Sequence, residues 1–270
     1  MILIGFSIFS LSIYSEKAFH ISDASKAEEN LVTSYTTSEV KMPGIREKVS
    51  FEGYEIVAKS TEENITLYAK KMEGFESQYR EFKIDFKGEI YSRPFWVNVT
   101  NPTYAPAIYF EDINEDNKDE LIIILTLGYG TGALLQEVYV YGYTNGLAKV
   151  LVDDPMAIIY KNVKTKLSNE EAELRIGNKE YKVDITPLDV EPENLFEDIG
   201  FGSIINYEVK DNQLTATIPA QISPAGFIGQ LVIVYEYRDK MYQAKSIEFQ
   251  PSALLTRPTD GVGKKSNDLN

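Results

Sequence analysis

Residues 111–132, "EDINEDNKDELIIILTLGYGTG", join an acidic loop to an apolar run and a glycine-rich turn. The first ten of these residues hold six carboxylates and one lysine. The next seven, Leu121–Leu127, are apolar or threonine and do not alternate with polar residues. A strand with this pattern is covered on both faces, so the stretch predicts a central β-strand that begins directly after a charged loop.

The chain on both sides of this stretch is rich in β-type segments. From about residue 51 onward, short runs of Ile, Val, Tyr, Phe and Thr are separated by Gly, Pro, Asn and Asp, and helical periodicity is scarce. Two-residue turn signals recur at Gly177-Asn178, Asp211-Asn212 and Asp239-Lys240. We therefore predict a mainly β protein of two β-rich modules: an antiparallel sheet with the acidic loop at 51–155, and a β-sandwich or small barrel at 156–250.

The two ends of the chain differ from this β-rich part. The first fourteen residues are uncharged and mostly apolar, which is typical of a secretory leader and short for a membrane span, so we predict a signal-like leader at 1–20. Residues 21–50 are polar and predict an arm or linker, and residues 251–270 predict a disordered tail. The expected protein is secreted or displayed at the cell surface, with no direct insertion into the membrane after the leader is removed.

Composition excludes several classes of function. The chain of 270 residues has 27 Lys and Arg against 41 Asp and Glu, and a net charge of −14 repels the phosphates of nucleic acids. It has no cysteine, and its one histidine, His20, falls in the predicted leader. The usual nucleophile, general base and zinc ligands are therefore missing from the predicted modules. We predict no catalytic residues and no organic cofactor.

The acidic loop has the spacing of a calcium site. Side chains two residues apart on a tightly curled loop point toward one centre, and hard oxygen donors suit Ca²⁺. Counted from its first aspartate, the donors at positions 1, 3, 5, 7 (a backbone carbonyl) and 9 belong to Asp112, Asn114, Asp116, Lys118 and Glu120. Position 6 is Asn117, which tolerates the left-handed backbone that such a loop needs. The sequence thus predicts a structural calcium ion, with a solvated acidic turn as the alternative.

A family resemblance adds to this prediction. The segment "DINEDNKDELIIIL" resembles the D-x-N-x-D-x-x-x-[DE] loop of FG-GAP and VCBS-type β repeats, in which the loop binds calcium and leads into a strand. The match covers roughly 20 residues and occurs once, whereas propellers need several blades, so a complete propeller is not expected. The flanking "RPFWVNVTNPTYAP" and "LTLGYGTG" resemble uncharacterised exported proteins of Bacillus-type bacteria, for which the resemblance implies no known activity.

Aromatic residues in two proline-rich stretches are candidate ligand contacts. Trp96 and Tyr104 lie in the first stretch, "RPFWVNVTNPTYAP". Phe227 lies in the second, "PAQISPAGFIGQ". Their flat faces suit sugar rings or a docked peptide, and core packing is the alternative.

The function that these features predict is non-catalytic binding or adhesion, with a cell-envelope polysaccharide or a protein as partner. One alternative is a secreted hydrolase that uses paired carboxylates on wall polysaccharide. Another is a module that binds a protein partner through the loop around Phe227.

Overall fold

The computed structural model describes residues 50–72 and 74–255, and it is mainly β, as the sequence predicts. The predicted leader, the arm up to residue 49 and the tail from residue 256 onward lie outside the described residues. The first sheet is antiparallel in the order β1-β2-β3-β4, with β5 paired to β3. Its strands are β1 (Glu55–Ser60), β2 (Ile65–Met72), β3 (Phe75–Phe86), β4 (Glu89–Arg93) and β5 (Asn98–Val99).

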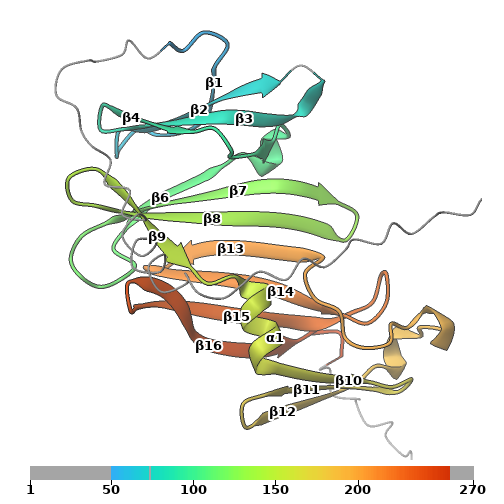
Figure 1. Cartoon of the computed structure of the whole chain (residues 1–270). Helices are drawn as coiled ribbons and strands as arrows, with labels where there is room; N and C mark the ends of the chain where they lie inside the picture. Colours follow the sequence, from blue (N-terminus) through green and yellow to red (C-terminus); the bar gives the residue numbers. More distant parts are fainter. Residues whose placement is uncertain (1–49, 73, 256–270) are drawn as a thin grey trace, which may run out of the picture. The chain divides into compact units, whose positions relative to one another are not determined.

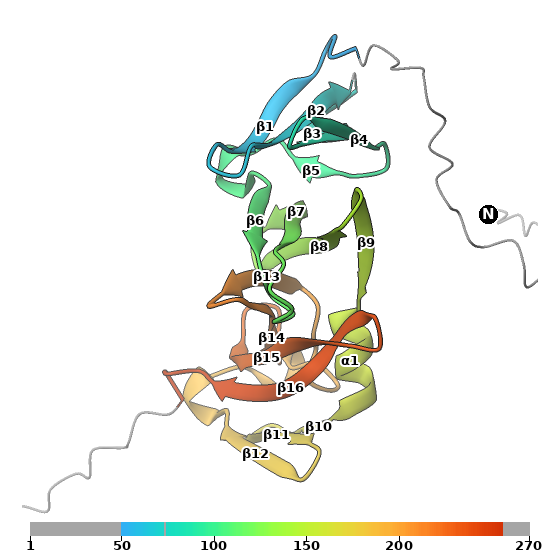
Figure 2. The same cartoon turned by 90° about the vertical axis from the view of Figure 1, so that its left-hand side faces the viewer.

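The second sheet is larger, and six of its eight strands form a closed circuit (Figures 1 and 2). It runs in the order β13-β14-β15-β16-β9-β8-β7-β6. Its strands are β6 (Ala107–Glu111), β7 (Glu120–Gly130), β8 (Ala133–Tyr143), β9 (Leu147–Val152), β13 (Ile204–Lys210), β14 (Gln213–Gln221), β15 (Phe227–Arg238) and β16 (Met241–Pro251). β8 pairs with β9 near its end and with β13 near its start, so β8, β9 and β13–β16 form a closed circuit of hydrogen-bonded strands.

Two short parallel contacts complete this circuit. Residues 204–205 of β13 pair with 134–135 of β8, and residues 241–242 of β16 pair with 151–152 of β9. The predicted module boundary at 155/156 follows β9, so strands from both predicted modules share this sheet.

A smaller layer covers one side of the barrel-like circuit. It consists of α1 (Pro155–Asn162) and a sheet of β10 (Val163–Leu167), β11 (Glu171–Ile176) and β12 (Lys179–Asp184), while single-turn 3₁₀ helices occupy Pro102–Tyr104 (η1), Thr186–Leu188 and Pro192–Asn194. Asp154 caps α1 by accepting a hydrogen bond from Ala157 N at 2.9 Å, and Pro155 fits the first helical turn because its missing N–H needs no partner there. In the described part of the chain, no helix is both long and apolar enough to span a membrane.

The predicted two-residue turns are confirmed. β11 and β12 join at Gly177-Asn178, β13 and β14 at Asp211-Asn212, and β15 and β16 at Asp239-Lys240. In the last two turns both residues have positive φ, between 51° and 66°, as tight hairpins require.

Two hydrophobic cores meet at β7. Leu121, Ile123 and Leu125 pack into one core with the first sheet. Ile122 and Ile124 point the other way, into a core built by β13–β16, α1 and the small sheet. The expectation that this strand is central and covered on both faces is thus confirmed. Glu120, the first residue of β7, stands where the acidic loop enters this packed strand.

Candidate functional site

The acidic loop between β6 and β7 folds around its own side chains. One N–H group, that of Asp116, donates both to Asp112 Oδ1 at 3.1 Å and to Asn114 Oδ1 at 2.8 Å. Asp112 Oδ2 accepts from Asn117 N at 2.8 Å, and Asp116 Oδ1 accepts from Lys118 N at 2.9 Å. The structure therefore brings together the side-chain oxygens of the first and third predicted donor positions.

Left-handed backbone at two residues makes this curl. Glu115 has φ 63° and Asn117 has φ 64°. The expected left-handed conformation at position 6 is confirmed at Asn117, whose short polar side chain carries less strain there than a branched one.

The side chain of Glu120 connects the loop to the rest of the protein by hydrogen bonds. Its side chain is buried, with 3% of its surface exposed. Oε1 accepts from Asn114 Nδ2 at 2.8 Å, and Oε2 accepts from Ile113 N at 3.2 Å. Oε2 also accepts from the hydroxyl of Tyr242, on β16, at 3.2 Å. Glu120, the ninth position, is thus hydrogen-bonded both to Asn114, the third position, and to Tyr242 in the circuit of strands.

The carboxyl group of Glu120 is buried and its pKa is shifted. Burial, the largest cause, and the negative charges of Asp116 and Asp112 together raise the pKa of Glu120 to about 7, against the hydrogen bonds from Ile113 and Tyr242, which lower it. No ion pair among the described residues includes Glu120. Burial and the Glu120 charge raise the pKa of Tyr242, so its hydroxyl remains a proton donor. The site is a buried carboxyl group that favours either a proton or a positive charge beside it.

The donor set suits a hard cation in its chemistry. All five predicted donors are oxygens, three of them carboxylates, and such ligands select Ca²⁺ over thiophilic metals. Within residues 50–72 and 74–255, no three His, Cys, Asp or Glu side chains are already gathered as a metal-binding group. The oxygens of Asp112 and Asp116 that accept backbone N–H groups take one hydrogen bond each and retain a second lone pair, whereas Glu120 Oε2 accepts two hydrogen bonds. The residue types therefore fit a calcium ion.

The three candidate contact aromatics lie in different surroundings. Trp96 is 5% exposed and packs in the first core, with its ring 4.3 Å from that of Tyr139. Tyr104, on η1, stacks on Tyr129 at a ring distance of 4.5 Å. Phe227 begins β15 and lines a cavity of about 380 Å³. Of the three candidates, Tyr104 belongs to a stacked pair with surface that a ligand can reach, because its partner Tyr129 is 47% exposed.

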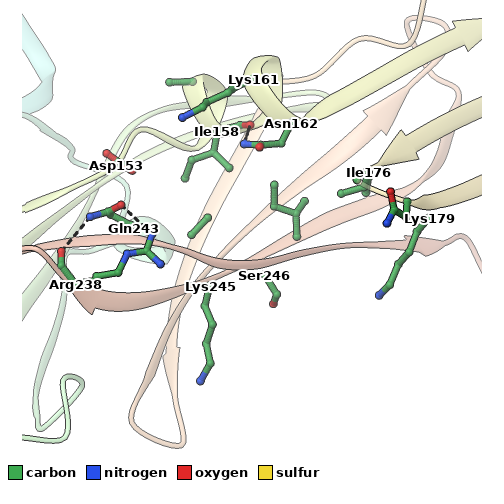
Figure 3. Close-up of a pocket in the computed structure, with 15 residues that line it drawn as sticks. Asp153, Ile158, Lys161, Asn162, Ile176, Lys179, Arg238, Gln243, Lys245 and Ser246 are labelled. Carbon is green, nitrogen blue, oxygen red and sulfur yellow. Dashed lines mark hydrogen bonds between the residues drawn. The ribbon is translucent and has the colours of Figure 1, made fainter.

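A larger cavity, of about 770 Å³, lies at α1 and was not predicted from the sequence (Figure 3). Its residues come from α1, β11, β12, β15 and β16, and no spacing along the chain links these segments. The local signal that could have been noticed is Asp154-Pro155, a cap and first turn typical of the helix that forms one wall.

Comparisons with protein-family models, with curated proteins and with solved structures find no match for this chain. The residues and their geometry are accordingly the basis for assigning a function.

Proposed function

We propose that this is a secreted or cell-surface protein that binds a partner at the cell envelope without catalysis, and that its acidic loop holds a structural calcium ion. The observation that carries the calcium proposal is Glu120. It is buried near Asp112 and Asp116, and no ion pair among the described residues includes it; such surroundings are unfavourable for an ionised carboxylate unless a positive charge joins it.

The candidate ligands are the four side chains at the alternating positions and one carbonyl: Asp112, Asn114, Asp116, Glu120 and the Lys118 carbonyl. Calcium would supply two positive charges where three carboxylates lie close in sequence. Through Glu120 and Tyr242, residues 122 positions apart, the loop is connected to β16. An ion held there would therefore stabilise the entry of β7 into both cores, which is a structural role.

Exposed aromatic rings support the binding part of the proposal. Phe95, between β4 and β5, is 93% exposed, and the Tyr104–Tyr129 stack presents another flat face. Large exposed rings are costly in water and suit stacking on sugars or insertion into a protein partner. A cell-envelope polysaccharide or a protein is the proposed partner.

Thermal unfolding in EDTA and in about 2 mM Ca²⁺ tests the calcium site. For a dissociation constant of about 0.1 mM, binding adds about 2 kcal/mol and raises Tm by roughly 4 to 8 °C. Asp112→Ala should abolish the shift. Asp119→Ala removes the same charge from the same loop at a position outside the donor set, so it should keep the shift. An absent shift in the parent protein, or equal loss in both variants, would contradict a calcium site.

Co-sedimentation with purified bacterial cell walls tests the binding role. The parent protein should pellet with the walls, and Phe95→Ala should pellet less without any change in Tm, because that ring packs against little of the protein. Failure to pellet would exclude wall polysaccharide as the partner, independently of the calcium result.

A further inference from the structure

The cavity at α1 has a fixed apolar wall. Ile158 comes from α1, Ile176 from the end of β11 and Ile247 from β16. Ile158 and Ile176 belong to the large core, and Ile247 packs against it. In Figure 3, Ile158 points from the helix toward β16. A molecule in this cavity of about 770 Å³ would therefore contact apolar side chains that are already held by the fold.

The charged residues that line the cavity are mostly basic, although the chain is acidic. One acidic residue, Asp153, lines it together with four basic ones, whereas the whole chain has 41 acidic and 27 basic residues. The four basic residues come one each from α1, β12, β15 and β16: Lys161, Lys179, Arg238 and Lys245. The fold brings these four elements together around one cavity.

Two of these basic residues are already paired. Lys179 Nζ lies 3.2 Å from Glu248 Oε1, and Arg238 Nη1 lies 2.8 Å from Glu236 Oε1. These pairs reduce the net charge that the two residues offer a ligand, and they restrain both side chains at the rim.

Lys161 and Lys245 are the remaining positive charges. Neither takes part in an ion pair among residues 50–72 and 74–255. Lys245 is the extra residue of a β-bulge, because Tyr235 pairs with Ala244 and Val234 pairs with Ser246. Bulges redirect side chains out of the regular alternation. Figure 3 shows Lys245 extending from β16 away from α1, so Lys161, on the helix itself, supplies the positive charge on the α1 side of the cavity.

We propose that this cavity binds a small organic anion with an apolar body, of the type of a medium-chain carboxylate. The hydrocarbon part contacts Ile158, Ile176 and Ile247, and the anionic group lies at the mouth, near Lys161. Nucleic acids and other large polyanions are poor ligands, because the net charge of −14 repels them and the cavity has the size of a small-molecule site. The proposal is independent of the calcium loop.

Titration of the isotopically labelled protein with octanoate tests this assignment. Octanoate should shift the methyl resonances of Ile158, Ile176 and Ile247. Octylamine has the same chain with the opposite charge, and acetate has the same charge without the chain; both should bind more weakly. Equal binding of octylamine would refute the role of Lys161, and equal binding of acetate would refute that of the apolar wall.

Matched variants locate the site. Lys161→Gln should weaken octanoate binding about twofold, the amount expected for one exposed charge. Lys59→Gln removes the same charge at an exposed position outside the cavity and should leave binding unchanged. Ala157→Phe places a ring at an exposed helix position that lines the cavity and should obstruct it. Equal loss in the two lysine variants, or full binding by Ala157→Phe, would overturn the proposal.

Discussion

Replacing Glu120 with glutamine should change how the stability of this protein depends on pH. The pKa of Glu120 is about 7 in the folded chain, against an ordinary value of 4.5. Between these two values the folded chain binds more protons than the unfolded chain. In the absence of metal, the contribution of Glu120 to the free energy of unfolding therefore falls as the pH rises from about 4.5 to about 7.

The size of this effect follows from the same two values. Between about pH 5.5 and about pH 7.5, linkage gives a loss of about 2 kcal/mol for one group shifted in this way. For a chain of this length that corresponds to roughly 4 to 8 °C in Tm. Other carboxylates titrate in the same range, so the meaningful quantity is the difference between parent and Glu120→Gln, which carries no ionisable group at this position.

The assay is thermal unfolding in EDTA at the two pH values for both proteins. The parent should lose about 2 kcal/mol more than the variant on going to the higher pH. Equal pH dependence in the two proteins would refute the view that a buried, uncompensated carboxyl group stands at the start of β7.

Two further substitutions test the connections around this site and in the circuit of strands. Tyr242→Phe removes the hydroxyl that donates to Glu120 and should cost about 1 kcal/mol of the free energy of unfolding, measured by urea denaturation, while raising the pKa of Glu120 further. Gly229→Ala should lower the free energy of unfolding by about 3 kcal/mol, because Gly229 has φ 152° and a Cβ would collide with the carbonyl oxygen of Gln250. An unchanged urea midpoint would show that β15 and β16 can separate at this point.

Local patterns were sufficient to predict much of the fold. The unbroken run Leu121–Leu127 indicated a strand covered on both faces, and its alternate residues do enter two different cores. Pairs such as Asp211-Asn212 specified hairpins because few residues adopt positive φ at low cost. These are short-range effects, because all the residues that determine them lie within one short stretch of sequence.

The long-range contacts could not be predicted in the same way. The circuit of strands closes through pairings of two residues each, between β8 and β13 and between β9 and β16, and such short parallel contacts have no signature in a single sequence. The loop spacing predicted Glu120 as a calcium ligand, but no pattern in the neighbouring sequence indicated that Tyr242, 122 positions later, would donate a hydrogen bond to it. The α1 cavity could not be predicted for the same reason, because its lining residues come from separate elements that the fold brings together.

The burial of Glu120 argues against an acidic loop that serves only for solubility. A turn that served only for solubility would gain nothing by placing one of its carboxylates in the core, where an ionised oxygen loses its hydration. Once Glu120 is buried, either a proton or a cation must balance it, and the two predict opposite effects of pH. A protonated Glu120 makes the metal-free protein more stable as the pH falls, whereas a calcium ion requires the ionised form and makes the loaded protein more stable as the pH rises. Calcium should therefore reverse the contribution that Glu120 makes to the pH dependence.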